Sequence, residues 1–176
     1  EMVALLGPNG SGKSTVLNTI SNLVAHNKGT ISFENKLISN EPTHKRTALG
    51  ISHVLERRRV FPHLTVYQNL VLGAWHPLAK EELESSLAKV FFLFPKLQKR
   101  SNQLAKTMSG GEQQMLAIAR GMMGVPKLLM IDEPFLGLSP IVMKDLTKVL
   151  KEIVASGISI LFVEQNVRLA LSMADR

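Results

Sequence analysis

The sequence predicts an α/β fold in which helices cover a parallel sheet in three layers, with a helical subdomain inserted into it. Short apolar runs typical of buried parallel strands occur at residues 2–6, 127–131 and 158–163, and a weaker run occurs at 50–54. Amphipathic helical patterns alternate with these runs. Residues 65–105 carry helical pattern without a convincing strand, and we expect them to form the inserted subdomain.

Length and composition favour one domain that spans residues 1–176. The chain is 45% hydrophobic, contains no cysteine and carries a formal charge of +7. A chain of this size buries one substantial core, and the absence of cysteine excludes disulfides and thiolate metal sites. No apolar run reaches the ~18 residues of a membrane span and no signal peptide is evident, so a cytoplasmic location is expected. The charge fits an anionic membrane surface, or a solvated face plus phosphate-binding groups, better than nucleic acid.

The first apolar run leads into a glycine-rich loop and then into a helix that begins near Lys13. The loop fits the pattern G-x-x-x-x-G-K-[ST] and consists of Gly7, Pro8, Asn9, Gly10, Ser11, Gly12, Lys13, Ser14 and Thr15. Its glycines let backbone N–H groups converge on phosphate oxygens, Lys13 reaches the β- and γ-phosphates, and Ser14 offers its hydroxyl to Mg²⁺. The positive end of the helix dipole adds to this attraction. We therefore expect a nucleoside triphosphate with Mg²⁺ as the ligand.

The next elements alternate between hairpin, strand and helix. Residues 30–38 alternate around the polar pair Glu34–Asn35 and predict a hairpin outside the parallel sheet. Two apolar stripes at helical spacing predict amphipathic helices, the second of which begins after Ser139–Pro140 and stops at Gly157. The stripes consist of Leu83, Leu87, Val90, Phe91 and Phe94, and of Val142, Leu146, Val149, Leu150 and Ile153.

Two carboxylates, Asp132 and Glu133, follow the apolar run at 127–131. They lie at the carboxyl end of a predicted strand, which is the edge where open α/β sheets bind their ligands. We expect Asp132 to hold Mg²⁺ directly or through water. Glu133 is the candidate to orient or deprotonate the attacking water.

A third motif consists of Ser109, Gly110, Gly111 and Glu112 and opens a predicted helix. Ser109 is a good N-cap, and the two glycines leave the first amides of the helix uncovered. By itself the motif fits a plain helix cap as well as an anion site.

Together the three motifs resemble the ATP-binding cassette family, whose hallmark is this combination at this spacing. The resemblance implies that the segment Ser109–Glu112 of one subunit presses on the γ-phosphate held by the loop of another, in a head-to-tail dimer. It places Glu56 where the family usually has a glutamine that contacts Mg²⁺ and water, and Gln165 at the family's switch histidine. Residues 138–140 take the place of a loop that contacts the dimer partner.

Within that family the chain is most similar to ATPase subunits of bacterial branched-chain amino acid transporters. The segments that carry the similarity are 56–62, 93–97, 107–120, 132–138 and 163–166. The chain departs from this subgroup at Arg57, where glycine is usual. It also lacks the preceding strands, with an aromatic residue that stacks on adenine, and the C-terminal tail, so we expect it to be truncated at both ends.

The resemblance implies an ATPase that powers import of branched-chain amino acids from the cytoplasmic face of the bacterial plasma membrane. The implied partners are a second ATPase subunit, identical or not, transmembrane permease subunits and, indirectly, a periplasmic or lipid-anchored substrate-binding protein. Importers of urea or short amides are the alternative within transporters. Outside transporters, the motifs also fit a cassette ATPase acting on ribosomes or nucleic acid, or a nucleotide-binding module without hydrolysis. The presence of Glu133 argues against such an inactive module.

The remaining polar and aromatic residues suggest no further chemistry. The five histidines do not have the spacing of a metal site. Trp75 and Tyr67 are too few for a base-stacking platform, so we expect no nucleic-acid partner. The basic run Arg57–Arg59 fits a solvated loop, a patch that faces a membrane-embedded partner, or a nucleic-acid contact. Four methionines at helical spacing are expected to fill the core: Met108, Met115, Met122 and Met123.

Overall fold

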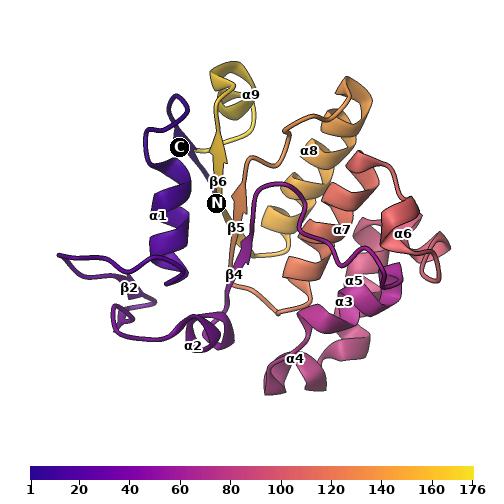
Figure 1. Ribbon diagram of the computed structural model, residues 1–176, viewed down its shortest axis with the longest axis horizontal. Coiled ribbons are helices and arrows are strands. Elements are labelled where there is room, and N and C mark those ends of the chain that lie inside the picture. Colours follow the sequence, from indigo (N-terminus) through magenta and orange to yellow (C-terminus); the bar gives the residue numbers. More distant parts are fainter.

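The computed structural model describes all residues 1–176, and its centre is a four-stranded parallel sheet. The strands are β1 (Met2–Leu6), β4 (Ile51–Val54), β5 (Leu128–Asp132) and β6 (Ser159–Glu164), in the order β1-β6-β5-β4. Helix α1 covers one face of the sheet, and α7 and α8 cover the other (Figure 1). The predicted three-layered α/β fold is therefore confirmed. The boundaries of three strands differ by one residue from those expected, so that Asp132 ends β5 rather than following it.

The other elements follow the predicted alternation. The predicted hairpin is present as two short antiparallel strands outside the main sheet. The hairpin strands are β2 (Ser32–Phe33) and β3 (Lys36–Leu37), and the helices are α1 (Lys13–Ile20), α2 (Thr43–Ala48), α3 (Val66–Gly73), α4 (Pro77–Glu81), α5 (Leu83–Leu93), α6 (Pro95–Lys99), α7 (Gly110–Met122), α8 (Pro140–Ala155) and α9 (Val167–Leu171), with a 3₁₀ turn at Ala105–Thr107.

Residues 65–105 form the four helices α3 to α6 and lie beside α7, away from the sheet (Figure 1). The two ends of this segment meet, because Thr65 and Leu104 form an isolated antiparallel bridge. The amide of Ala105 also donates to the carbonyl oxygen of Leu64 at 3.0 Å. The segment thus leaves the core and returns to it at one place, which supports its description as an inserted subdomain.

Both predicted apolar stripes contribute to the core. The second residue of the stripe on α5, Leu87, is buried together with Val90, and on α8 Leu146 and Leu150 are fully buried. The four methionines expected in the core are all buried as well. Most of these side chains belong to one apolar cluster between the sheet, α7, α8 and the inserted helices.

A buried arginine on α2 joins several backbone segments. Arg46 is 1% exposed, and its guanidinium donates to the carbonyl oxygens of Ser39, Glu41, Thr19 and Ile20 at 2.7 to 2.9 Å. Two of these oxygens lie at the C-terminal end of α1, where helix carbonyls have no partner within the helix. The arginine therefore fixes the end of α1 against the connection that leads into α2.

No helix of the protein combines the length and the apolar character that crossing a bilayer requires.

We predict that Arg46→Ala destabilises the fold, because it removes four hydrogen bonds and leaves the carbonyl oxygens of Ser39 and Ile20 without a donor. The expected loss is about 3 kcal/mol or more in the free energy of unfolding, as for other buried groups that lose a charged partner. Lys45→Ala is the matched control. Lys45 is exposed and pairs only with Glu41 on the surface, so its loss is expected to stay below about 1 kcal/mol. Urea denaturation of both variants measures the difference, and equal losses would contradict this role for Arg46.

Candidate functional site

The glycine-rich loop joins β1 to α1 and wraps around its lysine. Gly10 and Gly12 have φ values of 78° and 91°, a region that favours glycine, and Gly12 caps the first turn of α1. The Lys13 side chain is 7% exposed, and its ammonium donates to the carbonyl oxygen of Pro8 at 2.9 Å. The loop therefore holds a buried positive charge at the N-terminal end of a helix.

The carboxylates at the end of β5 lie beside this loop. The hydroxyl of Ser14 donates to Oδ1 of Asp132 at 3.0 Å, which links the start of α1 to the end of β5. Glu133 has a left-handed backbone with φ of 49°, and its carboxylate accepts a hydrogen bond from the side-chain amide of Gln165. β5 and β6 are in parallel register, with Asp132 opposite Val163, so both strand ends reach the same edge of the sheet.

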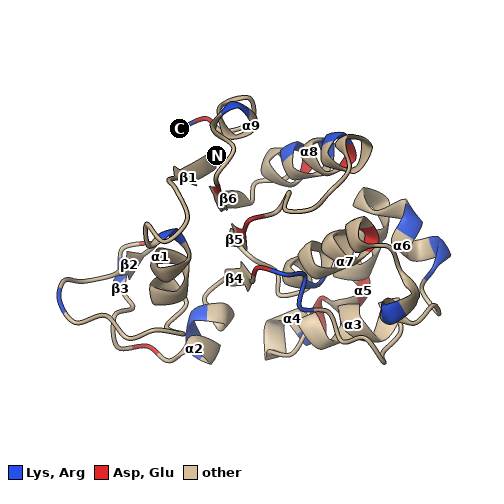
Figure 2. Ribbon diagram, turned by 45° about the horizontal axis from the view of Figure 1, so that its top comes forward, with Lys and Arg blue, Asp and Glu red and all other residues tan.

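These groups surround one cavity of about 490 Å³. Its lining includes the loop, both ends of the Glu133–Gln165 hydrogen bond, and Glu56, which follows β4 and pairs with Arg57 at 3.5 Å. Figure 2 shows acidic residues at the ends of β4 and β5. The lining residues are Asn9, Gly10, Gly12, Lys13, Ser14, Thr15, Glu56, Glu133, Leu136 and Gln165. Most of the predicted phosphate, metal and water-activating residues are thus brought together. Gly7, Pro8 and Ser11 do not line the cavity, and Asp132 is attached to it through Ser14.

The segment Ser109–Glu112 is not part of this cavity. Ser109 caps α7, since its hydroxyl accepts from the amide of Glu112 at 3.4 Å and its own amide donates to the Glu112 carboxylate at 2.9 Å. Arg100 pairs with that carboxylate at 3.2 Å. Burial alone would raise the pKa of Glu112, but the hydrogen bonds from Ser109 and the nearby positive charges outweigh it and lower the pKa. The helix cap is therefore present, and the anion site stays a prediction.

The electrostatics of the site favour a cation. The pKa of Asp132 is raised, chiefly by burial, and the hydrogen bond from Ser14 works against this rise. The negative charges of Glu56 and Glu133 raise it further, while Lys13 opposes them. Hydroxyl and carboxylate oxygens are the ligands that Mg²⁺ prefers. Ser14 and Asp132, with Glu56 nearby, therefore fit a magnesium ion bound next to a triphosphate.

The sequence pattern of the family described as "ABC transporter" matches residues 1–136. The chain belongs to this family. It is accordingly an ATP-hydrolysing subunit of a transporter, because proteins of the ABC transporter family with this domain are ATPases. The ATPase domains of this family bind ATP, usually with Mg²⁺, and work as dimers together with transmembrane permease subunits.

Three curated relatives illustrate how the family divides. The chain is 43% identical to the high-affinity branched-chain amino acid transport ATP-binding protein BraG of Pseudomonas aeruginosa, covering 100% of this chain and 75% of BraG. It is 38% identical to a probable branched-chain amino acid transport protein, LivF of Archaeoglobus fulgidus, covering 99% and 74%. It is also 33% identical to the lipopolysaccharide export protein LptB of Escherichia coli, covering 100% and 73%. Transport subunits with different cargo are thus similar to this sequence.

Solved structures of other ABC cassettes share the fold. The ADP-bound conformation of the cassette MJ1267 superimposes with a TM-score of 0.83 at 30% identity, covering 98% of this chain and 74% of that one. A dimeric post-hydrolysis state of the cassette MJ0796, bound to ADP and Pi, gives a TM-score of 0.80 at 25% identity, covering 97% and 77%.

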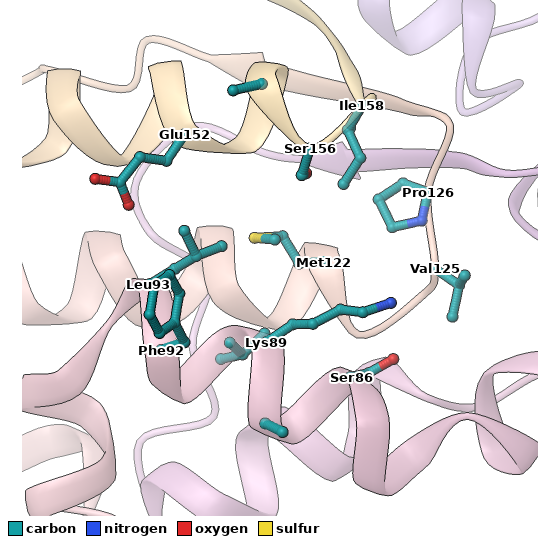
Figure 3. A pocket seen from close by; sticks show the side chains of 13 residues that line it. Ser86, Lys89, Phe92, Leu93, Met122, Val125, Pro126, Glu152, Ser156 and Ile158 are labelled. Carbon is teal, nitrogen blue, oxygen red and sulfur yellow. The ribbon is translucent and has the colours of Figure 1, made fainter.

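The largest cavity, of about 820 Å³, lies elsewhere, between α5, α7 and α8 (Figure 3). Its walls are mainly apolar, and the charged ends of Lys89 and Glu152 point away from each other at its two sides (Figure 3). Lys89 is its only cationic residue, and no glycine-rich loop borders it, whereas phosphates need several converging donors. Size alone would therefore indicate the wrong place for the nucleotide.

Some neighbours of the site carry no signal in the sequence. Leu136 lines the nucleotide cavity, although the segment 132–138 that contains it gave no reason to assign it a role in binding. Among the histidines, His76 is 3% exposed, with Nε2 3.0 Å from the carbonyl oxygen of Gly124, and it caps α4, so its role is structural as expected. His53 and Arg120, by contrast, end in a groove that the sequence does not indicate.

We predict that Asp132→Asn stabilises the nucleotide-free protein at neutral pH. Because the folded-state pKa of Asp132 lies above its unfolded value, stability falls as the pH rises from about 4 through that pKa. Asparagine keeps an acceptor for Ser14 and removes the charge. We expect a gain in melting temperature at about pH 8 that becomes smaller as the pH falls toward ~4. ATP with Mg²⁺ is expected to stabilise only the wild type.

Thermal unfolding followed by circular dichroism measures this pH dependence. Asp145→Asn is the control, because Asp145 lies on the exposed side of α8 and pairs with Lys96. A gain in both variants, or in neither, would contradict the assignment of Asp132.

Proposed function

We propose that this ABC transporter ATPase powers the import of branched-chain amino acids at the cytoplasmic face of the bacterial plasma membrane. One observation supports the ATPase chemistry most directly: the loop, the Ser14–Asp132 pair and the Glu133–Gln165 pair meet at one cavity. The cargo rests on the likeness to BraG and LivF. Because LptB is similar too, the cargo is tested directly by the uptake experiment.

In the proposed reaction the loop binds the triphosphate first. The Lys13 ammonium leaves the carbonyl oxygen of Pro8 and moves to the β- and γ-phosphates, while loop amides donate to the remaining oxygens. Mg²⁺ held by Ser14 and Asp132 would neutralise charge on the phosphates and help to align them. Glu56 borders the same cavity, where its carboxylate is placed to hold a metal-bound or attacking water.

Glu133 is proposed to take the proton of the attacking water. Its carboxylate is held by the side-chain amide of Gln165, which fixes its direction without changing charge near neutral pH. Histidine, usual at the position of Gln165, would titrate in this range. We therefore assign Gln165 a positioning role toward Glu133.

A second subunit is proposed to complete the site. The segment Ser109–Glu112 opens α7 with two glycines and lies outside the cavity of its own chain. A head-to-tail dimer would bring it onto the γ-phosphate of the partner's nucleotide. The similar cassette MJ0796 forms a dimer in its post-hydrolysis state with ADP and Pi, which supports dimerisation of this chain.

We predict opposite effects for two variants of this site. Lys13→Ala is expected to lose ATP binding, because Lys13 is the only side-chain cation in the cavity. Glu133→Gln is expected to keep ATP binding, to lose turnover by about 100-fold or more, and to accumulate an ATP-dependent dimer. Calorimetric titration and phosphate release measure the two properties. Wild-type turnover in Glu133→Gln would place water activation elsewhere.

The permease subunit is proposed to contact a groove between α2, β4, α3 and α7, which we call the docking groove. Four exposed apolar side chains border this cavity of about 450 Å³: Leu23, Phe61, Leu72 and Trp75. The lining contains no acidic residue and two arginines, Arg46 and Arg120. An apolar segment with an acidic side chain therefore complements it in shape and charge.

Two buried polar atoms without a partner support this assignment. Burial lowers the pKa of His53 to about 4, so its ring is neutral at pH 7. The Ser21 hydroxyl lies 3.0 Å from the carbonyl oxygen of Leu17 and 3.0 Å from Nδ1 of His53, and Nε2 of the same ring is buried without a partner. Nη1 of Arg120 is likewise unpartnered, although its Nη2 donates to Arg59 and its guanidinium stacks on Phe61. Both atoms are shielded from solvent, so a partner would satisfy them only after the side chains that cover them move aside.

We predict that deletion of the gene abolishes high-affinity uptake of leucine, isoleucine and valine and leaves urea uptake intact. Radiolabelled leucine and urea measured in parallel in the deletion strain test the cargo. Normal leucine uptake, in a strain without a redundant importer, would reject the cargo and leave the ATPase assignment in place.

Complementation of the same strain tests the docking groove. A gene carrying Trp75→Ala is expected to restore little uptake, although the purified variant hydrolyses ATP normally. Phe92→Ala is the control, because Phe92 is 82% exposed and apolar but borders the cavity of Figure 3. Equal uptake with both genes would count against the groove.

A further inference from the structure

The loop after β4 has a backbone conformation that is energetically unfavourable for the residues it contains. Arg57, Arg58 and Arg59 have φ values of 65°, 67° and 36°, so three consecutive side-chain-bearing residues adopt the left-handed region. This conformation favours glycine. The run follows Glu56 and leads from the sheet toward α7 (Figure 2). It brings the Arg58 side chain to the N-terminal end of α7.

The guanidinium of Arg58 lies against two glycines. A Cβ at position 110 would come within 2.7 Å of Cζ of Arg58, so the guanidinium packs directly against the glycine backbone. A Cβ at position 137 would lie 3.5 Å from its Nη2. Arg58 therefore occupies the space between the start of α7 and the segment that follows Glu133, in a cavity of about 290 Å³ that Glu133 also borders.

The half-buried guanidinium of Arg58 has no partner within the subunit. No carboxylate or carbonyl oxygen accepts a hydrogen bond from the Arg58 guanidinium. The first turn of a helix carries a partial positive charge, so the guanidinium and α7 repel each other. Glu133 is nearby, but its carboxylate pairs with Gln165. An anion from outside the subunit would therefore match the local charge.

We propose that Arg58 contacts the terminal phosphate of the nucleotide carried by a second copy of this chain. The inference rests on the head-to-tail dimer proposed above, in which Gly110 faces that nucleotide. A guanidinium donates to two phosphate oxygens at once, and does so most strongly where water is excluded. Lys13 of one subunit and Arg58 of the other then hold the same triphosphate from opposite sides. Arg58 adds affinity to the dimer and none to the first binding of ATP.

The test uses Glu133→Gln as background, because this variant is expected to trap the ATP-bound dimer. Arg58→Ala, Arg58→Lys and Arg59→Ala are added to it separately. Arg59 shares the loop conformation but is exposed, and it serves as the matched control. Analytical ultracentrifugation with ATP or ADP gives the dimer dissociation constant, and calorimetry at dilute, monomeric concentrations gives the ATP affinity. Melting temperatures report whether each variant folds.

With ATP, Arg58→Ala is expected to weaken the dimer by about 10- to 100-fold, which is typical of a lost charge-assisted hydrogen bond. Arg58→Lys is expected to recover part of this loss, Arg59→Ala to match the background, and the monomer's ATP affinity to stay unchanged in all three. Equal dimerisation of Arg58→Ala and Arg59→Ala would reject the role of Arg58 and leave the proposed function standing. Weaker ATP binding by the Arg58→Ala monomer would instead show that Arg58 acts within its own subunit. Absence of any ATP-dependent dimer in the background would reject the dimer and this inference with it.

Discussion

The parallel register of three strands is the constraint on which the site depends. Leu6 lies opposite Glu164 and Asp132 lies opposite Val163, so β1, β6 and β5 end at the same level. The residues at and beyond these ends supply the loop, the carboxylates and Gln165. Because side chains alternate between the faces of a sheet, a slip of one residue would turn Asp132 away from Ser14. The apolar cores on both faces of the sheet hold this register in place.

The same edge concentrates charge that the fold alone does not balance. Asp132, Glu133 and Glu56 gather near one cation, Lys13, and the raised pKa of Asp132 reflects this crowding together with burial. The charged groups that ligand binding needs lack partners in the folded protein. They therefore lower the stability of the fold, as at many functional sites. Two further sites hold positive charge that the fold does not balance: Arg58 beside α7 and Arg120 in the docking groove. Each is a positive group that lacks a full set of partners within the chain.

Local patterns predict the sheet, the hairpin, the amphipathic helices and most residues of the nucleotide cavity. These signals, such as strand periodicity and the glycine-rich loop, depend on residues that are neighbours in the sequence. Contacts made by single residues across long sequence separations were not predictable. Nothing in the sequence distinguishes Arg46 from a surface residue, yet it donates to the carbonyl oxygens of Thr19 and Ile20, which lie 27 and 26 residues earlier in the chain. No spacing in the sequence marks His53 as a metal ligand or as any other special residue, and only its surroundings reveal the unpartnered ring nitrogen. The φ of 65° at Arg57 explains why glycine is usual at this position in the subgroup that the sequence resembles, and nothing in the structure explains the arginine found here.

The bridge between Thr65 and Leu104 bears on how quickly the chain folds. Strands β4 and β5 are neighbours, although all of the inserted helices lie between them in the sequence. If the ends of the insertion pair early, the loop that must close before β4 meets β5 becomes roughly half as long, which lowers its entropic cost by about 0.6 kcal/mol. The insertion is then a loop that is already closed when β4 and β5 pair. Formation of its helices and the slower pairing of the parallel strands can then be separate kinetic steps.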